Sequence, residues 1–263
     1  MKLSLKNWSF RSKQSSINKA FTLLLVIILS ITANSQIANY VSNGSFEELK
    51  DCNGQNSNKV KYWSSIDTTK FSYYIMNKCF NNVPGLNSNF QYPKEGNGFV
   101  GGTFFCGGLC DSIHNRSYFR NKMKSTLVSN TVYCVKFYVN LRNSSPYGID
   151  AIGVYFGNST LDTINYCDTK ITYLNPQIQN ATGNVILDTV NWISVSGTFT
   201  ANGTEKFLVI GNFKKDNNIT ITQVGTSTDL WSDLYIDDVS CIALNMPSYA
   251  GSDVSIFAGD SVF

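Results

Sequence analysis

Residues 131–141 show the clearest alternation of apolar and polar side chains in the chain. Every second position there is apolar or aromatic (Tyr133, Val135, Phe137, Val139 and Leu141), which is the period of a β-strand with one buried face. The same alternation recurs at residues 149–156, 192–200, 207–213 and 230–242. Shorter strand-like segments lie at residues 37–47, 60–63, 71–75, 99–105 and 117–126, the first of them interrupted by Asn43 and Gly44. The pattern therefore predicts roughly nine strands.

The connections between these segments indicate the fold class. Few windows show helical periodicity, and Gly and Asn mark frequent turns. Strands joined by turns without helical crossovers predict an antiparallel sandwich or barrel. The long connections at residues 48–97 and 161–187 favour a jelly roll over a simple meander. We predict an all-β, antiparallel jelly-roll β-sandwich, in which the first and last strands pair and protect an open edge.

The last predicted strand carries two adjacent carboxylates, Asp237 and Asp238, in an apolar setting. Regular alternation would place Leu234, Ile236 and Asp238 on one face and Tyr235, Asp237 and Val239 on the other. Buried carboxylates need a partner, and a second acidic stretch, with Glu47 and Glu48, lies near the beginning of the chain. We predict that the two ends meet and that their acids share a structural cation; the alternative is that these acids are solvated at strand ends.

The first 35 residues resemble a targeting segment. They contain five basic residues and no acidic one, followed by a short apolar run at residues 21–33 and the small residues Ala33 and Ser35. This order is typical of a secretory signal peptide, and we predict cleavage before Gln36. A membrane anchor is the alternative, but the run is shorter than the ~20 residues needed to cross a bilayer. Residues 36–244 then form one domain.

Removal of this segment reverses the sign of the net charge. The whole chain carries 21 basic and 18 acidic residues, a net charge of +3. Without the five basic residues of the segment, 16 basic residues oppose 18 acidic ones, a net charge of −2. Nucleic acid and anionic membranes are therefore not expected as partners, and no span is expected in the mature chain.

All seven cysteines lie after the targeting segment, at positions 52, 79, 106, 110, 134, 167 and 241. In an oxidising compartment they are expected to form disulfides, with one thiol left over. The local pairs Cys52–Cys79 and Cys106–Cys110 are predicted first. Cys134, in the middle of a strand, is predicted to be a buried free thiol or the partner of Cys241. Zinc is not expected, because no second Cys/His pair accompanies Cys106 and Cys110.

Residues 245–263 differ from the preceding domain. Pro247 marks an exit from the last strand, and an isolated strand-like piece follows. We predict a linker or the beginning of a truncated following module.

Catalysis is not predicted from the residue pattern. Asp237 and Asp238 face opposite sides of a strand and cannot act as a paired acid and base. The only histidine, His114, lies in a loop, and no nucleophile elbow precedes a helix. Phosphate-binding glycine loops are also missing, since Gly101–Gly102 and Gly107–Gly108 lack the lysine and helix that follow in such loops.

Sugar binding would use aromatic rings flanked by amide and carboxylate groups. The candidates are Tyr147, Asp150, Tyr155, Asn212, Asp216 and Trp231. Packing in the core or at the rim of the sandwich is the alternative for each of them. Five Asp-Ser/Thr motifs, beginning at Asp67, Asp111, Asp162, Asp188 and Asp260, also match a short acceptor pattern for bacterial O-glycosylation.

Several stretches together resemble a known family. Residues 43–47 (NGSFE) and 235–240 (YIDDVS) are similar to the terminal strands of galactose-binding-like jelly rolls, which include many carbohydrate-binding modules. Residues 133–139, 188–192, 196–199 and 210–214 resemble the N-terminal module of surface proteins exported by the type IX (gliding-motility-associated) route, and residues 250–261 resemble the linker to the next repeat. The C-terminal sorting domain usual in such proteins is not present in this sequence.

The resemblance implies a structural calcium between the terminal strands. Glu47 and Asp237 match the ligand positions, with Asn43 as a further oxygen donor, and oxygen ligands suit calcium. It also implies an exported or cell-surface, non-catalytic module for adhesion or for binding a glycan or cell-surface polysaccharide, followed by further modules of the same protein. A purely structural spacer and a hydrolase with an unrecognised site are the alternatives.

Overall fold

The computed structural model describes residues 38–53, 59–66, 74–85, 90–107, 116–158 and 170–244. The predicted targeting segment, the predicted linker and His114 lie outside these residues, as do Cys110 and Cys167. In the described ranges no helix is long and apolar enough to cross a membrane.

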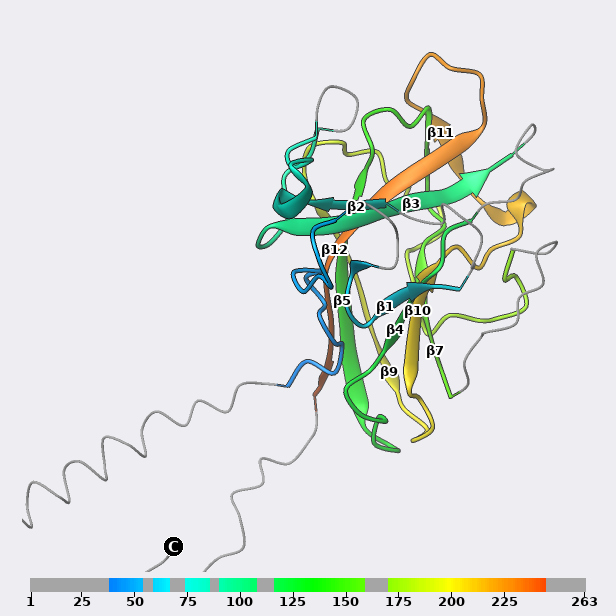
Figure 1. The fold of residues 1–263 in the computed structure, drawn as a ribbon. Helices are drawn as coiled ribbons and strands as arrows, with labels where there is room; N and C mark the ends of the chain where they lie inside the picture. Colours follow the sequence, from blue (N-terminus) through cyan, green and yellow to red (C-terminus); the bar gives the residue numbers. More distant parts are fainter. Residues whose placement is uncertain are drawn as a thin grey trace, which may run out of the picture. The chain divides into compact units, whose positions relative to one another are not determined.

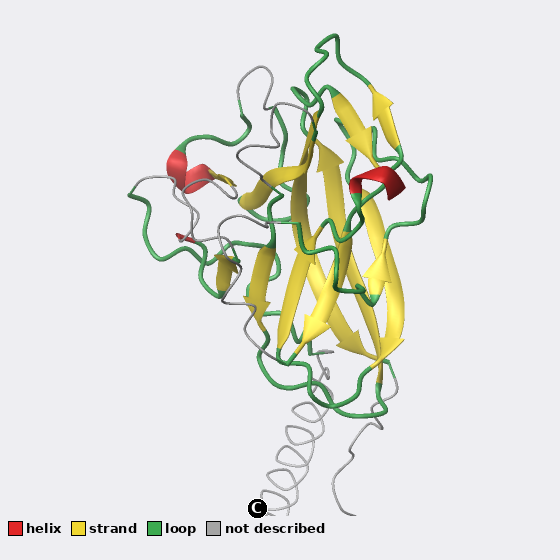
Figure 2. Ribbon diagram, turned by 90° about the vertical axis from the view of Figure 1, so that its right-hand side faces the viewer, coloured by secondary structure: helices red, strands yellow, loops and turns green. Residues whose placement is uncertain are grey.

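Two five-stranded antiparallel sheets form the fold, as predicted (Figures 1 and 2). The first sheet has the order β1-β4-β10-β7-β8. Its strands are β1 (Trp63–Ser65), β4 (Phe119–Lys122), β10 (Phe207–Gly211), β7 (Gly153–Gly157) and β8 (Ile178–Gln179).

The second sheet has the order β2-β3-β12-β5-β9. Its strands are β2 (Tyr74–Asn77), β3 (Gly98–Cys106), β12 (Trp231–Ala243), β5 (Val132–Leu141) and β9 (Ile193–Thr200). A separate ribbon pairs β6 (Tyr147–Ile149) with β11 (Ile221–Gln223). Short 3-10 turns occur at η2 (Lys78–Phe80) and η5 (Asp216–Asn218).

Strand β5 shows how the alternating sequence becomes the core. Its five predicted inward residues, from Tyr133 to Leu141, are all 0% exposed and pack with Leu208 and Ile210 of the opposite sheet. The intervening Cys134, Lys136 and Tyr138 are half-buried on the outer face. The prediction for this strand is confirmed, because burial of one face fixes the register of a strand.

The predicted alternation of β12 fails at Asp238. Its backbone is left-handed (φ 48°), and the pairing with β5 shifts register between Asp237 and Ser240. A bulge of this kind inserts one extra residue and reverses the side-chain faces beyond it. Val239 therefore joins Leu234 in the core instead of lying beside Asp237.

The beginning of the domain meets β12, as predicted, but not as a continuous strand. Asn39 forms one antiparallel bridge with Ile242, and the amide of Tyr40 donates to the carbonyl of Cys241 at 2.9 Å. Left-handed backbone at Asn43 (φ 50°) and Phe46 (φ 58°) then turns the chain away. The predicted strand at residues 37–47 is thus a bridge followed by a turn.

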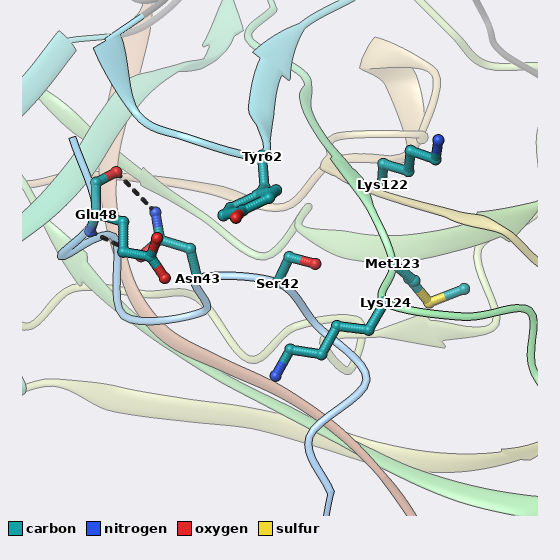
Figure 3. Close-up of a pocket in the computed structure, with 7 residues that line it drawn as sticks. All are labelled: Ser42, Asn43, Glu48, Tyr62, Lys122, Met123 and Lys124. Atoms are coloured by element: carbon teal, nitrogen blue, oxygen red, sulfur yellow. Dashed lines mark hydrogen bonds between the residues drawn. The ribbon is translucent and has the colours of Figure 1, made fainter. Parts of the chain in front are cut away.

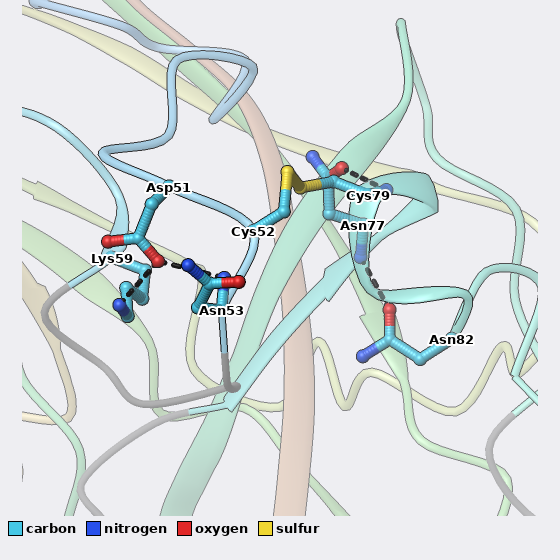
Figure 4. Close-up of a disulfide and its surroundings, with 7 residues drawn as sticks. All are labelled: Asp51, Cys52, Asn53, Lys59, Asn77, Cys79 and Asn82. Atoms are coloured by element: carbon cyan, nitrogen blue, oxygen red, sulfur yellow. Dashed lines mark hydrogen bonds and ion pairs between the residues drawn. A yellow bond between two sulfur atoms is a disulfide. The ribbon is translucent and has the colours of Figure 1, made fainter.

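The cysteine predictions are confirmed in part. Cys52 and Cys79 form a disulfide (Figure 4), and Cys106 is also disulfide-bonded. Cys134 and Cys241 are both free thiols. They cannot pair in this register, because Cys134 lies opposite Ile242, so that Cys241 points to the other face of the sheet. Cys134 is half-buried rather than buried.

The disulfide fastens the segment before β1 to the turn after β2. Replacing both Cys52 and Cys79 by alanine is expected to lower the free energy of unfolding by about 2–4 kcal/mol, because the bond closes a loop with a sequence separation of 27 residues in the unfolded chain. Urea unfolding of both proteins measures the difference. An unchanged midpoint would show that the bond does not constrain the unfolded chain, and a reduced wild type provides the control.

Candidate functional site

A cavity of about 450 Å³ opens between the turn at the beginning of the domain and the end of β4. It is lined by Ser42, Asn43, Glu48, Tyr62, Lys122, Met123 and Lys124. In Figure 3 the Tyr62 ring lies in the middle, with Glu48 and Asn43 on one side and Lys122 and Lys124 on the other. The volume falls in the range of small-ligand sites.

Asn43 builds one wall of this cavity. Its Nδ2 donates to the carbonyls of Glu48 and Lys61, both at 3.0 Å, and its Oδ1 accepts from the amide of Glu48. The Asn43 carbonyl accepts from the indole N–H of Trp63 at 2.9 Å. Asn43 therefore joins two segments of chain, and asparagine tolerates the left-handed backbone that this position requires.

Tyr62 presents an aromatic surface to the cavity. Its side chain is 56% exposed, and its backbone is left-handed (φ 68°). This conformation is unusual for a bulky residue and costs about 1–2 kcal/mol. The neighbouring bonds maintain it, since the Tyr62 carbonyl accepts from the side-chain amide of Asn121 at 3.1 Å. Strain of this kind often occurs at binding sites.

The Tyr62 ring has both acidic and basic side chains around it. Glu48, Lys122 and Lys124 are exposed, so their charged ends are available to a ligand. An exposed aromatic ring with hydrogen-bonding groups on both sides can stack on a pyranose while the charged groups bind its hydroxyls.

The two acids predicted to bind a cation converge on one loop. Asp237 Oδ2 accepts the amides of Lys94 and Glu95 at 2.8 and 3.2 Å. Glu47 Oε1 accepts the amides of Asn97 and Gly98 at 2.8 and 3.0 Å. The beginning of the chain and its last strand therefore hold residues 94–98 from two sides.

Asp237 lies in an environment that disfavours its negative charge. Its side chain is 0% exposed. Burial raises its pKa to about 8, although the amides of Glu95, Asp238 and Lys94 oppose the shift. A cation beside the carboxylate would remove the penalty, and in this respect the position suits calcium.

The third predicted ligand, Asn43, is engaged in hydrogen bonds with the backbone. Its Nδ2 donates two bonds and its Oδ1 accepts one, and no cluster of three or more metal-ligating acidic, histidine or cysteine side chains occurs in the described residues. Glu47 and Asp237 are thus the two side chains that would hold the ion.

Three of the six residues predicted to bind sugar are linked to one another through two basic residues. Lys214 donates to the side chains of Asp150 and Asn212, and Arg116 donates to the Asn212 carbonyl and to Asp216. Asp150 and Asn212 are 0% exposed and make structural bonds. Tyr147, Tyr155 and Trp231 are half-buried. Tyr147 belongs to the β6–β11 ribbon, whereas Tyr155 packs against Phe213 with ring centroids 6.3 Å apart and Trp231 begins β12.

Asp216 is part of a charged cluster. It accepts a hydrogen bond from Arg116, whose side chain is 1% exposed, and another from Lys170 at 2.6 Å. Burial raises the Asp216 pKa, but the bond from Lys170 and the positive charge of Arg116 outweigh burial, so the pKa lies below its usual value. Asp216 positions a buried guanidinium, which is a structural role.

Three further acidic residues are also structural. Asp150 binds Lys214, Asp237 binds backbone amides, and Asp233 accepts hydrogen bonds from Thr103 and Arg142 at 2.7 Å each. Among the O-glycosylation motifs only Asp188 lies in the described residues, where its carboxylate accepts the amides of Val190 and Asn191. That motif therefore lies in a tight turn.

The sequence did not predict the cavity residues that offer exposed charges and an exposed aromatic ring. Tyr62, Lys122 and Lys124 come from two segments 60 residues apart that meet only when β1 pairs with β4. The pair Tyr62–Trp63 before a short strand was the one available signal, because two bulky neighbours on a strand cannot both face the core.

No protein-family model matches the sequence, and no curated protein matches it. Similar solved structures include the CBM22-1 xylan-binding domain of Xyn10C from Paenibacillus barcinonensis (12% identity, TM-score 0.41, covering 78% of this chain and 94% of that one). A cleaved adhesin domain of Lys-gingipain from Porphyromonas gingivalis is 15% identical (TM-score 0.38, 70% and 92% covered). TmCBM61, solved with β-1,4-galactotriose, is 15% identical (TM-score 0.32, 79% and 99% covered).

Carbohydrate-binding modules and an adhesin domain are thus among the structures similar to this chain. Because all three TM-scores lie below 0.5, neither the fold nor a function of this chain is argued from them.

Proposed function

We propose that this chain is an exported, non-catalytic module that binds glycans and serves in adhesion. The observation that carries the proposal is the cavity of about 450 Å³ with the exposed, left-handed Tyr62 at its centre. The ring would stack on a sugar, and Glu48 with Lys122 and Lys124 would bind its hydroxyls. Export through residues 1–35, the type IX route and further modules of the same protein belong to the same proposal and rest on the sequence alone.

A non-catalytic role agrees with the use of the described acids. Asp150, Asp233 and Asp237 each bind structural groups, and Glu48 is the acidic residue of the cavity lining. A glycosidase would need two carboxyl groups facing one another about 5–10 Å apart.

Tyr62→Ala is expected to weaken glycan binding roughly tenfold or more, since stacking and burial of one aromatic ring contribute on the order of 1.5 kcal/mol. A glycan array with the secreted chain identifies the ligand, and titration of the best ligand measures the loss. Tyr173→Ala is the matched control, because that side chain is 68% exposed and does not line the cavity.

Equal losses in the two variants, or no loss in Tyr62→Ala, would contradict the assignment of this site. An array without any bound glycan would favour a structural spacer, and release of sugar from a bound glycan would favour a hydrolase.

A further inference from the structure

The outer face of the second sheet carries a cluster of lysines around one tyrosine. The Nζ atoms of Lys94 and Lys136 lie 4.6 and 5.3 Å from the centroid of the Tyr138 ring. Lys136 and Tyr138 are two residues apart on β5 and therefore share a face, whereas Lys94 comes from the loop at residues 94–98. This face is distinct from the Tyr62 cavity, none of whose lining residues belongs to it.

The position of Lys94 is fixed by the strand beside Tyr138. Its amide donates to the carboxylate of Asp237, and Asp237 is the β12 residue opposite Tyr138. The carboxylate is directed to the backbone of the loop, so it binds the loop while the Lys94 side chain stays exposed. The sheet thus brings a second ammonium group to the same ring as Lys136.

Neither ammonium group has an acidic partner in the part of the chain that the structure describes. Three other described lysines, at positions 59, 170 and 214, form ion pairs with aspartates. Within the described residues, the side chains of Lys94 and Lys136 form no ion pair and no hydrogen bond. Glu95 follows Lys94 and is exposed, but it forms no ion pair with either lysine. Each ammonium group lies against the Tyr138 ring, which supplies a cation–π attraction but no negative charge, so both can still pair with an anionic group of a ligand.

The surroundings of the two lysines offer hydroxyl and aromatic groups. Ser194 and Ser196 of β9 lie opposite Tyr138 and Lys136, and both are exposed. Phe90 and Tyr92 form an exposed aromatic pair shortly before Lys94 in the same segment. Their ring centroids lie 5.4 Å apart. The indole N–H of Trp192, which precedes β9, donates to the Tyr92 carbonyl at 3.0 Å and ties this pair to the sheet.

We propose that this face binds an acidic polysaccharide, with its carboxylate or sulfate group between Lys94 and Lys136. The serines of β9 bind sugar hydroxyls, and Phe90 and Tyr92 offer rings for stacking. A nucleic acid fits less well, because it needs a row of cations along its phosphates and the cluster around Tyr138 has two.

The test measures binding of the full secreted chain to polygalacturonate, which carries carboxylates, and to dextran sulfate, which carries sulfates. Uncharged dextran and single-stranded DNA are the comparison polymers. The double variant K94Q/K136Q is expected to bind the acidic polymers roughly tenfold more weakly. Raising the salt from about 0.1 M to about 1 M is expected to reduce wild-type binding, because the Debye length falls from about 10 Å to about 3 Å.

Lys206→Gln is the control, because this lysine is exposed and its removal also changes the net charge. If K94Q/K136Q loses binding to only one of the two acidic polymers, the anionic group of that polymer is the one recognised. Unchanged binding by K94Q/K136Q, an equal loss in Lys206→Gln, or preference for DNA would each overturn the proposal. Tyr62→Ala is expected to leave acidic-polymer binding intact, so this site and the Tyr62 cavity can fail separately.

Discussion

At pH 5, Asp237→Ala is expected to lower the free energy of unfolding by about 2–5 kcal/mol and the melting temperature by at least about 4 °C. The carboxylate accepts three backbone amides, from Lys94, Glu95 and Asp238, at 2.7–3.2 Å. Alanine leaves these partly exposed amides without their side-chain acceptor, and each lost hydrogen bond costs about 0.5–1.5 kcal/mol net. Thermal and urea unfolding measure the change.

The control for this variant is Glu48→Ala, which removes an exposed acid from the neighbouring turn. It is expected to change the free energy of unfolding by less than about 0.5 kcal/mol. If the two variants lost the same amount, the loss would reflect net charge rather than the amides of residues 94–98. Asp237→Asn is expected to lie between them, because one of its side-chain atoms becomes a donor that faces an amide.

The same carboxyl group would be a ligand of the calcium ion predicted between Glu47 and Asp237. Because its pKa is raised to about 8 in the folded chain from 3.8, the folded state keeps a proton between these pH values that the unfolded state has lost. The contribution of Asp237 to stability therefore falls as the pH rises from about 4 to about 8 in the presence of a chelator. Calcium bound to the ionised group would oppose this fall. If calcium left the pH profile unchanged, the proposed ion between Glu47 and Asp237 would be rejected.

The parts of the fold that were predicted correctly are strands in which apolar and polar residues alternate. Burial of alternate residues fixes β5, and the same pattern finds β9, β10 and β12 within two residues at either end, but it places the beginning of β7 four residues too early. The bulge at Asp238 could not be predicted, because it depends on an isolated left-handed residue in the middle of a strand. Strands of two or three residues, such as β8 and β11, carry no periodicity at all.

The candidate site could be predicted only in part. The prediction that the acidic stretches at the beginning and the end of the domain meet agrees with the structure, because Glu47 and Asp237 both accept backbone amides of residues 94–98. The predicted sugar-binding residues Asp150 and Asn212 are buried instead, because a polar side chain at the end of a strand can equally bind a loop backbone. Asn212 does so, donating to the Phe104 carbonyl at 2.8 Å.

Lys214→Met is expected to lower the free energy of unfolding by about 3–5 kcal/mol at pH 7. Lys214 Nζ lies 3.1 Å from Asp150 Oδ2, and the two side chains are 12% and 0% exposed. Methionine keeps the length of the side chain but leaves a buried carboxylate without its cation. The amides of Gly183 and Thr220 still bind Asp150, at 2.8 and 3.0 Å, which favours the lower end of this range.

The loss in Lys214→Met is expected to shrink as the pH falls below about 4. Burial raises the Asp150 pKa, but the amide of Gly183, the ammonium of Lys214 and the amide of Thr220 outweigh it, so the pKa lies below 3.8. A carboxyl group with a lowered pKa stabilises the fold above the unfolded value, and this contribution is lost as the pH falls through the folded value. Once Asp150 is protonated, little charge remains for Lys214 to neutralise.

Urea unfolding of wild type and Lys214→Met from pH 7 to pH 3 measures this convergence. Lys215→Met is the matched control, because the neighbouring lysine is exposed and its replacement makes the same change in net charge. A loss in Lys214→Met that stays constant across the pH range would assign the effect to packing of the lysine stem rather than to the ion pair. A convergent loss would show that the loops at residues 180–184 and 212–220 are held together by one buried charge.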